Sequence, residues 1–461
     1  MSHPKADQVC RFARDRLPQT VERLAGYLRY PAISCDPAHF DDVRRLARRI
    51  RDDLEGLGFA RARVLELEDA LPCVAAEKLV GDGPCVLIYG HLDLQPVKGE
   101  PWRTPPHELT RKGDRLYARG SGDDMGGWVS HLAAIEAWLS VAGSLPCNVK
   151  LLIEGEEEIG SPNLERYMDA YPDAFQSDVM VLTDCENPST EVPGLTVSLR
   201  GLMELEVICE ALGSDVHSGL WGNLAPDVSM ALIKVLSRLI DDDGRLAVGR
   251  VEVPEAWAKA AYDVPLTDPL VRKGAHVIDG VASLPERGRA RAEWAWRQPA
   301  VTILSTTLPT PDLEKNALRA AASATLSIRI APGQTREEIK TLITDAVTGD
   351  PPGGVKISVN EKPGGADSWL YTPRGPAFAA ADRAYEKAWG HPLVQIGIGG
   401  SIPFVALFGR RYSHLPLILN GVLDPESSIH GPNESMHIGV FEKAIAANVY
   451  LLDELGDLPR S

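Results

Sequence analysis

The sequence predicts an α/β fold in which a mixed, mostly parallel sheet is covered by helices and is interrupted by an inserted α+β domain. Short apolar segments alternate with helical patterns over residues 1–194, as expected of strands that are buried on both faces. The pattern changes over residues 195–363, and the alternation returns over residues 364–461. The first and last of these segments are therefore expected to form one domain, and the middle segment another.

The first part of the chain reads as two helices followed by alternating strands and helices. Amphipathic helices are expected at roughly 7–29 and 39–57, the second ended by the glycines that flank Leu57. Further helices are expected to begin near Gly126 and over about 162–171. The apolar segments predicted as strands lie at about 72–79, 85–90, 148–154 and 178–183.

The middle of the chain has the order expected of a compact α+β unit, and the end returns to α/β texture. The predicted middle elements are a strand over 199–212, a helix over 226–241, a Trp- and Pro-rich stretch to about 311, a strand over 323–332, a helix over 335–347 and a strand over 355–362. Those at the end are a helix over 375–389, strands over 393–398 and 415–419, and a helix from about 434.

Composition limits the kinds of partner. The 461 residues are enough for two domains, and the net charge of −16 argues against nucleic acid or an anionic membrane. No N-terminal apolar region and no apolar stretch of membrane-spanning length is present. The seven cysteines are dispersed without a C-x-x-C pair, which favours reduced thiols. We therefore expect a cytoplasmic protein.

A first group of candidate site residues follows an apolar strand. The segment YGHLDLQP places His91 and Asp93 just beyond residues 85–90, where open α/β sheets bind ligands. A neutral imidazole suits zinc, manganese or cobalt, and an aspartate two residues on can hold its other ring nitrogen. A single H-x-D is a weak signal of a metal site, so the prediction of one depends on the other segments of the sequence.

Further carboxylates and a second histidine follow other strand ends. ARGSGDDMGG carries Asp123 and Asp124, and EGEEEIGS carries three glutamates after a strand. VLTDCEN supplies Asp184, and SSIHGPNES supplies His430. Packed carboxylates repel one another unless a cation is present. Two histidines with several carboxylates match a pair of divalent ions that share one aspartate.

Other chemistries are less well supported by the sequence. The Gly-rich loop 120–127 does not match a phosphate-binding motif, and its two aspartates would repel phosphate. No G-x-S-x-G elbow is present, which removes the usual serine-hydrolase interpretation. Cys185 adjoins Asp184 and is a candidate nucleophile, but no histidine near it can be identified in the sequence.

Taken together, GHLDLQP, RGSGDDMGG, EGEEEIGS, Asp184, DVHSGLWGN and HGPNE resemble, in order and spacing, the M20 metallopeptidases, in particular their carnosinase-like dipeptidase branch. The resemblance covers nearly the whole chain. It implies two divalent metal ions, with zinc expected and manganese or cobalt as alternatives. The implied ligands of one ion are His91, Asp123 and Asp184, and those of the other are Asp123, Glu158 and His430.

The resemblance also implies roles beyond the ligands. Asp93 would orient His91, and Glu157 would be the general base that takes a proton from the metal-bridging water. The inserted domain would be a lid and dimerisation domain. Its His217 would reach a neighbouring subunit's site in a homodimer and stabilise the oxyanion. Arg329 and Ser401 would bind the substrate's terminal carboxylate.

The implied activity is hydrolysis of a dipeptide or short peptide. An N-acyl-amino-acid deacylase using the same two ions is the nearest alternative, and a non-catalytic metal-binding relative is a third reading. Met125 departs from the family pattern, since a lysine often follows the paired acids. The lysine would not be a ligand, so the expected effect is on metal affinity or on the pKa of the metal-bound water.

Overall fold

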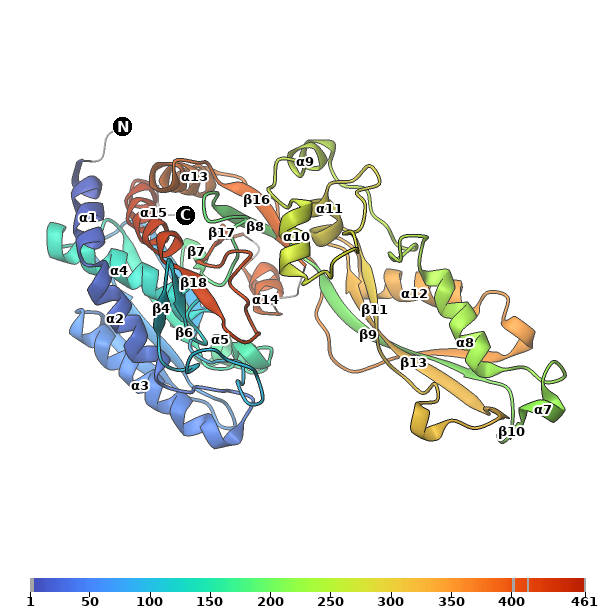
Figure 1. The fold of residues 1–461 in the computed structure, drawn as a ribbon. Helices are drawn as coiled ribbons and strands as arrows, with labels where there is room; N and C mark the ends of the chain where they lie inside the picture. Colours follow the sequence, from blue (N-terminus) through green and yellow to red (C-terminus); the bar gives the residue numbers. More distant parts are fainter. Residues whose placement is uncertain (1–3, 400–402, 413, 460–461) are drawn as a thin grey trace.

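The computed structural model describes residues 4–399, 403–412 and 414–459 and shows two lobes (Figure 1). One lobe is built on a six-stranded sheet and contains both ends of the described chain. The other lobe is built on a four-stranded sheet and extends away from the first (Figure 1). No helix in the described ranges is long and apolar enough to cross a membrane.

The six-stranded sheet has the order β1-β2-β6-β3-β7-β17. Its neighbours β6, β3, β7 and β17 pair in parallel, whereas β1 and β2 pair antiparallel at one edge. The predicted mixed, mostly parallel sheet is thus confirmed. The strands are β1 (Ala60–Leu65), β2 (Cys73–Lys78), β3 (Cys85–His91), β6 (Asn148–Glu154), β7 (Val179–Leu182) and β17 (Leu417–Leu419).

Helices cover both faces of this sheet, and a separate apolar cluster lies under each layer. One layer contains α1 (Pro4–Asp15), α2 (Leu17–Leu28), α3 (Phe40–Gly56), α4 (Met125–Ala142), α13 (Pro376–Trp389) and α15 (Ile438–Gly456). The other contains α5 (Leu164–Ala170), α6 (Pro172–Phe175) and α14 (Pro403–Arg411). Burial on both faces explains why strands such as β3 are apolar throughout.

The helix expected over residues 7–29 is two helices that meet at Arg16. Pro18 lies in the first turn of the second helix, where its missing N–H has no partner to lose. Inside a continuous helix, the same ring would clash with the carbonyl of Arg14. The proline therefore ends α1 and begins α2.

The four-stranded sheet has the order β11-β13-β9-β14, all antiparallel. Its strands are β9 (Gly201–Glu210), β11 (Ala300–Thr306), β13 (Ala321–Ile330) and β14 (Lys356–Glu361). Buried and part-buried residues alternate along β9, so one face packs on α8 (Val228–Leu236) and α12 (Arg336–Thr348). Strand β11 is an edge strand with an exposed end.

The chain passes between the lobes close to Arg200. Strand β8 (Gly194–Leu199) pairs with β15 (Trp369–Leu370) and β16 (Val394–Ile398), and its side chains pack in the cores of the first lobe. The next strand, β9, begins the four-stranded sheet at Gly201. The domain limits at 195 and 363 remain predictions. Strand β8, most of which follows the predicted limit at 195, packs with the first lobe.

The other elements are short. Near the six-stranded sheet, β4 (Thr110–Lys112), β5 (Arg115–Tyr117) and β18 (Ser435–His437) form a small sheet. The second lobe also has β10 (Val216–His217), β12 (Ala317–Leu318), α7 (Ser218–Trp221), α9 (Glu255–Ala260), α10 (Asp268–Gly274) and α11 (Arg291–Trp296). Single 3-10 turns span Pro37–His39, Glu157–Ile159, Ser237–Leu239, Pro311–Leu313 and Pro352–Gly354.

Candidate metal centre

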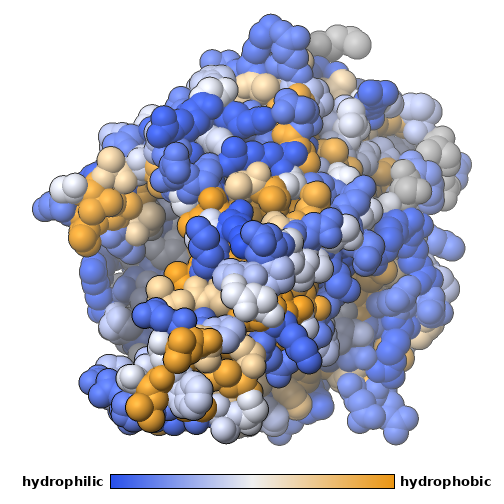
Figure 2. Space-filling model, turned by 90° about the vertical axis from the view of Figure 1, so that its right-hand side faces the viewer, coloured by the Kyte–Doolittle hydropathy of each residue, from blue (hydrophilic) through white to orange (hydrophobic). Residues whose placement is uncertain are grey.

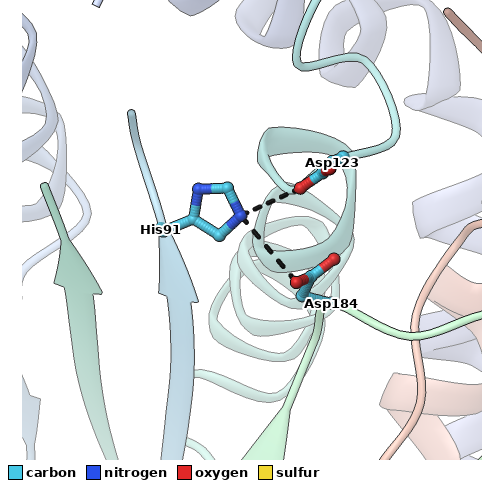
Figure 3. A group of neighbouring side chains, drawn as sticks. All are labelled: His91, Asp123 and Asp184. Atoms are coloured by element: carbon cyan, nitrogen blue, oxygen red, sulfur yellow. Dashed lines mark hydrogen bonds and ion pairs between the residues drawn. The ribbon is translucent and has the colours of Figure 1, made fainter. Parts of the chain in front are cut away.

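Three neighbouring parallel strands bring the candidate ligands to one edge of the six-stranded sheet. His91 ends β3, Glu157 follows β6, and Asp184 follows β7. Since these strands run in the same direction, their carboxyl ends meet at the same edge. Asp123 approaches this edge from the loop before α4, and its side chain points toward His91 (Figure 3).

The first group of potential ligands is His91, Asp123 and Asp184. The Nε2 atom of His91 lies 3.0 Å from Oδ1 of Asp123 and 4.0 Å from Oδ2 of Asp184 (Figure 3). His91 is fully buried and holds its Nδ1 atom 3.1 Å from the backbone oxygen of Asp93. That contact places the Nδ1 proton on the backbone side, so Nε2 is free to bind a cation.

The second group is Asp123, Glu158 and His430. The Nε2 atom of His430 lies 3.1 Å from Oδ2 of Asp123 and 3.2 Å from Oε2 of Glu158. Asp123 thus presents one carboxylate oxygen to each histidine. This is the arrangement required of an aspartate that bridges two ions.

The charges at this site fit divalent cations. Within the described ranges, no lysine or arginine forms an ion pair with any of the four carboxylates Asp123, Glu157, Glu158 and Asp184. Burial raises the pKa of Glu157 and of Asp184 well above the ordinary values, and neighbouring carboxylates raise them further. Cations would remove this penalty, and imidazole with carboxylate is a donor set that zinc, manganese and cobalt accept.

Glu157 lies beside both groups without belonging to either. Its Oε2 atom is 4.0 Å from Nε2 of His91. The Asp93 carboxylate accepts hydrogen bonds from the backbone N–H groups of Glu157 and Glu158 at 3.1 and 3.0 Å. Asp93 therefore holds the loop that carries both glutamates, in addition to its contact with His91.

Two further side chains support the ligands. Asp124 is buried and accepts hydrogen bonds from the His91 N–H at 3.2 Å and from the Thr183 hydroxyl at 2.7 Å. Gln95 donates to Oε2 of Glu158 at 2.7 Å. Both residues stand inside motifs that the sequence singled out, but their roles depend on contacts that spacing alone does not reveal.

Two other candidates, His217 and Arg329, lie in the second lobe. Strand β10, which ends at His217, lies at the far end of the second lobe (Figure 1). Arg329 stands at the opposite end of the four-stranded sheet, paired with Leu202 at the start of β9. Ser401 lies outside the described residues. Met125 is buried in the apolar core beneath α4.

Cys185 is poorly suited to act as a nucleophile. Its side chain is buried, and burial together with Asp184 raises the pKa of its thiol well above the ordinary value. The reactive thiolate is therefore disfavoured.

A mostly parallel sheet covered by helices, with histidine and carboxylate side chains at its strand ends, is typical of α/β metallohydrolases. Residues 87–454 match Peptidase family M20/M25/M40, and the chain belongs to this family. It is a hydrolytic enzyme of the peptidase type, as the sequence predicted.

Comparison with individual proteins gives the same family. The chain is 31% identical over 461 residues to the cysteinylglycine-S-conjugate dipeptidase of Corynebacterium striatum, covering 98% of this chain and 99% of the relative. It is 27% identical over 470 residues to human beta-Ala-His dipeptidase, covering 94% and 89%. The solved structure of the dipeptidase Dug1p from Saccharomyces cerevisiae has the same fold, with a TM-score of 0.77 at 23% identity and complete coverage of both chains. The resemblance to the carnosinase-like dipeptidase branch is confirmed.

Proposed function

We propose that this chain hydrolyses dipeptides with the help of two divalent metal ions, for which zinc is expected and manganese or cobalt are alternatives. The observation that carries the proposal is Asp123, whose two carboxylate oxygens face different histidines, Oδ1 toward His91 and Oδ2 toward His430. The similar proteins from Corynebacterium striatum and human are named as dipeptidases. A cytoplasmic location is part of the proposal, since none of the seven cysteines, all of them described, is joined in a disulfide.

When bound, the two ions lower the pKa of water and polarise the scissile carbonyl. Glu157 then accepts the proton of the attacking water and passes it to the leaving amine. Its carboxylate is suited to this role because it lies beside both ligand groups and is not required as a ligand. Asp93 fixes its position through the backbone of the same loop.

His217 completes the site from a second subunit in this proposal. Its Nδ1 atom accepts the Gly219 N–H at 3.0 Å, so the proton of the neutral ring sits on Nε2. The exposed Nε2–H can donate to an oxyanion. Because β10 lies at the far end of the second lobe (Figure 1), His217 cannot serve the metal centre of its own chain.

An apolar surface near His217 supports a homodimer through the second lobe. Leu220, Trp221 and Leu224 are more than half exposed on and after α7, and Met230 is 62% exposed on α8. Figure 2 views the molecule from this end and shows hydrophobic side chains gathered on it. An exposed apolar patch of this kind marks an interaction surface. The edge strand β11 adds Ile303 and Leu304, which are also about half exposed.

Arg329 is the proposed partner of the substrate carboxylate. Arg329 is half-buried and forms no ion pair with a carboxylate among the described residues. Arg200 lies nearby, and burial together with the charge of Arg329 lowers the pKa of Arg200 to about 10. Two neighbouring arginines that form no ion pair with an acidic residue in the described part of the chain favour an anionic group in the substrate. The role predicted for Ser401 remains a prediction.

The experiment that tests the function is a substrate screen with supplementary zinc, manganese or cobalt. Release of free amino acid is followed for a panel of dipeptides and for N-acyl amino acids built on the same residues. We expect turnover of dipeptides to exceed that of the acylated compounds. Preference for N-acyl amino acids would assign the deacylase activity instead, and no hydrolysis of either class would overturn the proposal.

A further inference from the structure

Glu434 contacts the loop that carries the bridging aspartate, although it comes from the end of the chain. Its side chain is buried, and Oε1 accepts hydrogen bonds from the backbone N–H groups of Gly120, Gly122 and Asp123 at 3.0, 3.2 and 3.2 Å. Three donors on one oxygen hold the loop 120–123 in a single conformation. The last of these donors belongs to Asp123 itself.

The other carboxylate oxygen of Glu434 is held by a buried arginine. Oε2 accepts from Nη1 of Arg119 at 2.9 Å, and Arg119 is 1% exposed. Arg119 also donates to Glu100 at 3.0 Å, and its guanidinium lies 5.3 Å from the centre of the Trp102 ring. With these contacts, the carboxylate of Glu434 has little freedom to move.

A pair of short strands explains how the two segments meet. Strands β5 and β18 pair antiparallel, with Ser435 opposite Tyr117 and Met436 opposite Leu116. The Ala118 N–H donates to the backbone oxygen of Glu434 at 3.2 Å, which extends the contact beyond the strands. One strand leads directly into the Asp123 loop, and the other is preceded by the His430 loop.

We propose that Glu434 is a positioning residue that fixes Asp123 relative to His430. His430 precedes Glu434 by four positions, so a single residue connects the loops that supply two ligands of the second group. The inference rests on the proposed dinuclear site and adds to it a residue that is not itself a ligand. Residues that orient metal ligands in this way affect affinity nearly as strongly as the ligands do.

The test compares Glu434→Gln with a matched control, Asp424→Asn. Asp424 is also a buried carboxylate in the same segment, and it pairs with Arg115 through two contacts of 3.0 Å. Among the described residues it makes no hydrogen bond to loop 120–123, so its substitution controls for the loss of a buried carboxylate in this segment. Stepwise affinity for zinc and for manganese is measured by chelator competition on the full-length protein, and the thermal midpoint reports folding.

We expect Glu434→Gln to weaken binding of one ion about 10- to 100-fold, while Asp424→Asn stays within about threefold of the wild type. Glu434→Asp keeps the charge but withdraws the carboxylate from the loop, so we expect a similar loss of metal affinity. If Glu434→Gln does not fold, the affinity of Glu434→Asp tests the inference in its place. Wild-type affinity in a folded Glu434 variant overturns the inference, as does an equal loss in Asp424→Asn. A wild-type protein that binds fewer than two ions contradicts the proposed site itself, which is a separate outcome.

Discussion

The Oδ2 atom of Asp123 lies 3.1 Å from Nε2 of His430, although the two residues are far apart in the sequence. The other oxygen of Asp123 faces His91 at 3.0 Å. Both groups of potential ligands therefore depend on the position of one carboxylate. Asp123 differs in this respect from Asp184, which belongs to the first group of potential ligands only.

Loss of Asp123 should affect both ions. In Asp123→Asn, we expect the metal content to fall from about two ions per chain to below one, because each ion loses a charged ligand. Asp184→Asn should remove or weaken one ion and leave the other. Elemental analysis after supplementation and desalting measures both. Equal metal content in the two variants would contradict a bridging role for Asp123.

Glu157 should matter for turnover and not for metal content. We expect Glu157→Gln to retain both ions and to lower kcat by about 10²- to 10⁴-fold, because the amide cannot accept the proton. The matched control is Glu156→Gln. Glu156 accepts hydrogen bonds from the Leu71 N–H and the Asn163 side chain, both at 2.8 Å, so its substitution should lower the thermal midpoint and leave kcat nearly unchanged. Similar kcat losses in both variants would refute the assignment.

Mixing two inactive variants tests whether His217 acts across a dimer. His217→Ala and Glu157→Gln are each expected to be nearly inactive. In a mixed dimer, one site receives an intact Glu157 from one subunit and an intact His217 from the other. After random exchange of equal amounts, we expect about a quarter of the wild-type activity to return. No recovery, despite exchange verified by tagged subunits, would place His217 outside the partner's site.

The apolar surface on α7 and α8 should hold the dimer together. We expect Leu224→Glu to shift the molar mass measured by light scattering from dimer toward monomer, since it puts a charge on a residue that is 77% exposed in the single chain. Ile278→Glu is the control, because Ile278 is similarly exposed at 72% but lies outside this patch. The same mass for both variants would mean that this surface is not the interface.

His131 should make stability depend on pH. Burial lowers the pKa of its imidazole to about 3, whereas the unfolded value is about 6.5. Between these values, the unfolded chain binds a proton that the folded chain does not. The free energy of unfolding therefore falls as pH falls, by at most about 1.4 kcal/mol per pH unit. The thermal midpoint of the wild type should drop more between pH 7 and pH 5 than that of His131→Leu; parallel curves would contradict this.

The ligands at strand ends could be predicted because their signal is local. An apolar run such as residues 85–90 identifies a buried strand, and a parallel sheet brings residues after such strands together. The contact between Glu434 and the Asp123 loop depends instead on the register of β5 and β18. Strands of three residues leave no periodic pattern, so the sequence gives no sign of that pairing.

The contacts of the Trp-rich stretch also depend on residues that are distant in the sequence. Trp294 lies against Arg245, with the guanidinium 4.3 Å from the ring centre, and Trp257 lies against Arg297 at 4.5 Å. These are contacts between a cation and an aromatic face, formed by residues far apart in the chain. A tryptophan in sequence predicts burial but not which arginine covers it.

The pairing of β5 with β18 also has a consequence for how the protein matures. Since His430 and Glu434 come long after β5 in the sequence, the second group of ligands forms only once both segments of the chain have been synthesised. Ions that bind only this arrangement stabilise it over partly folded forms. Metal uptake would then favour chains in which β18 has paired with β5.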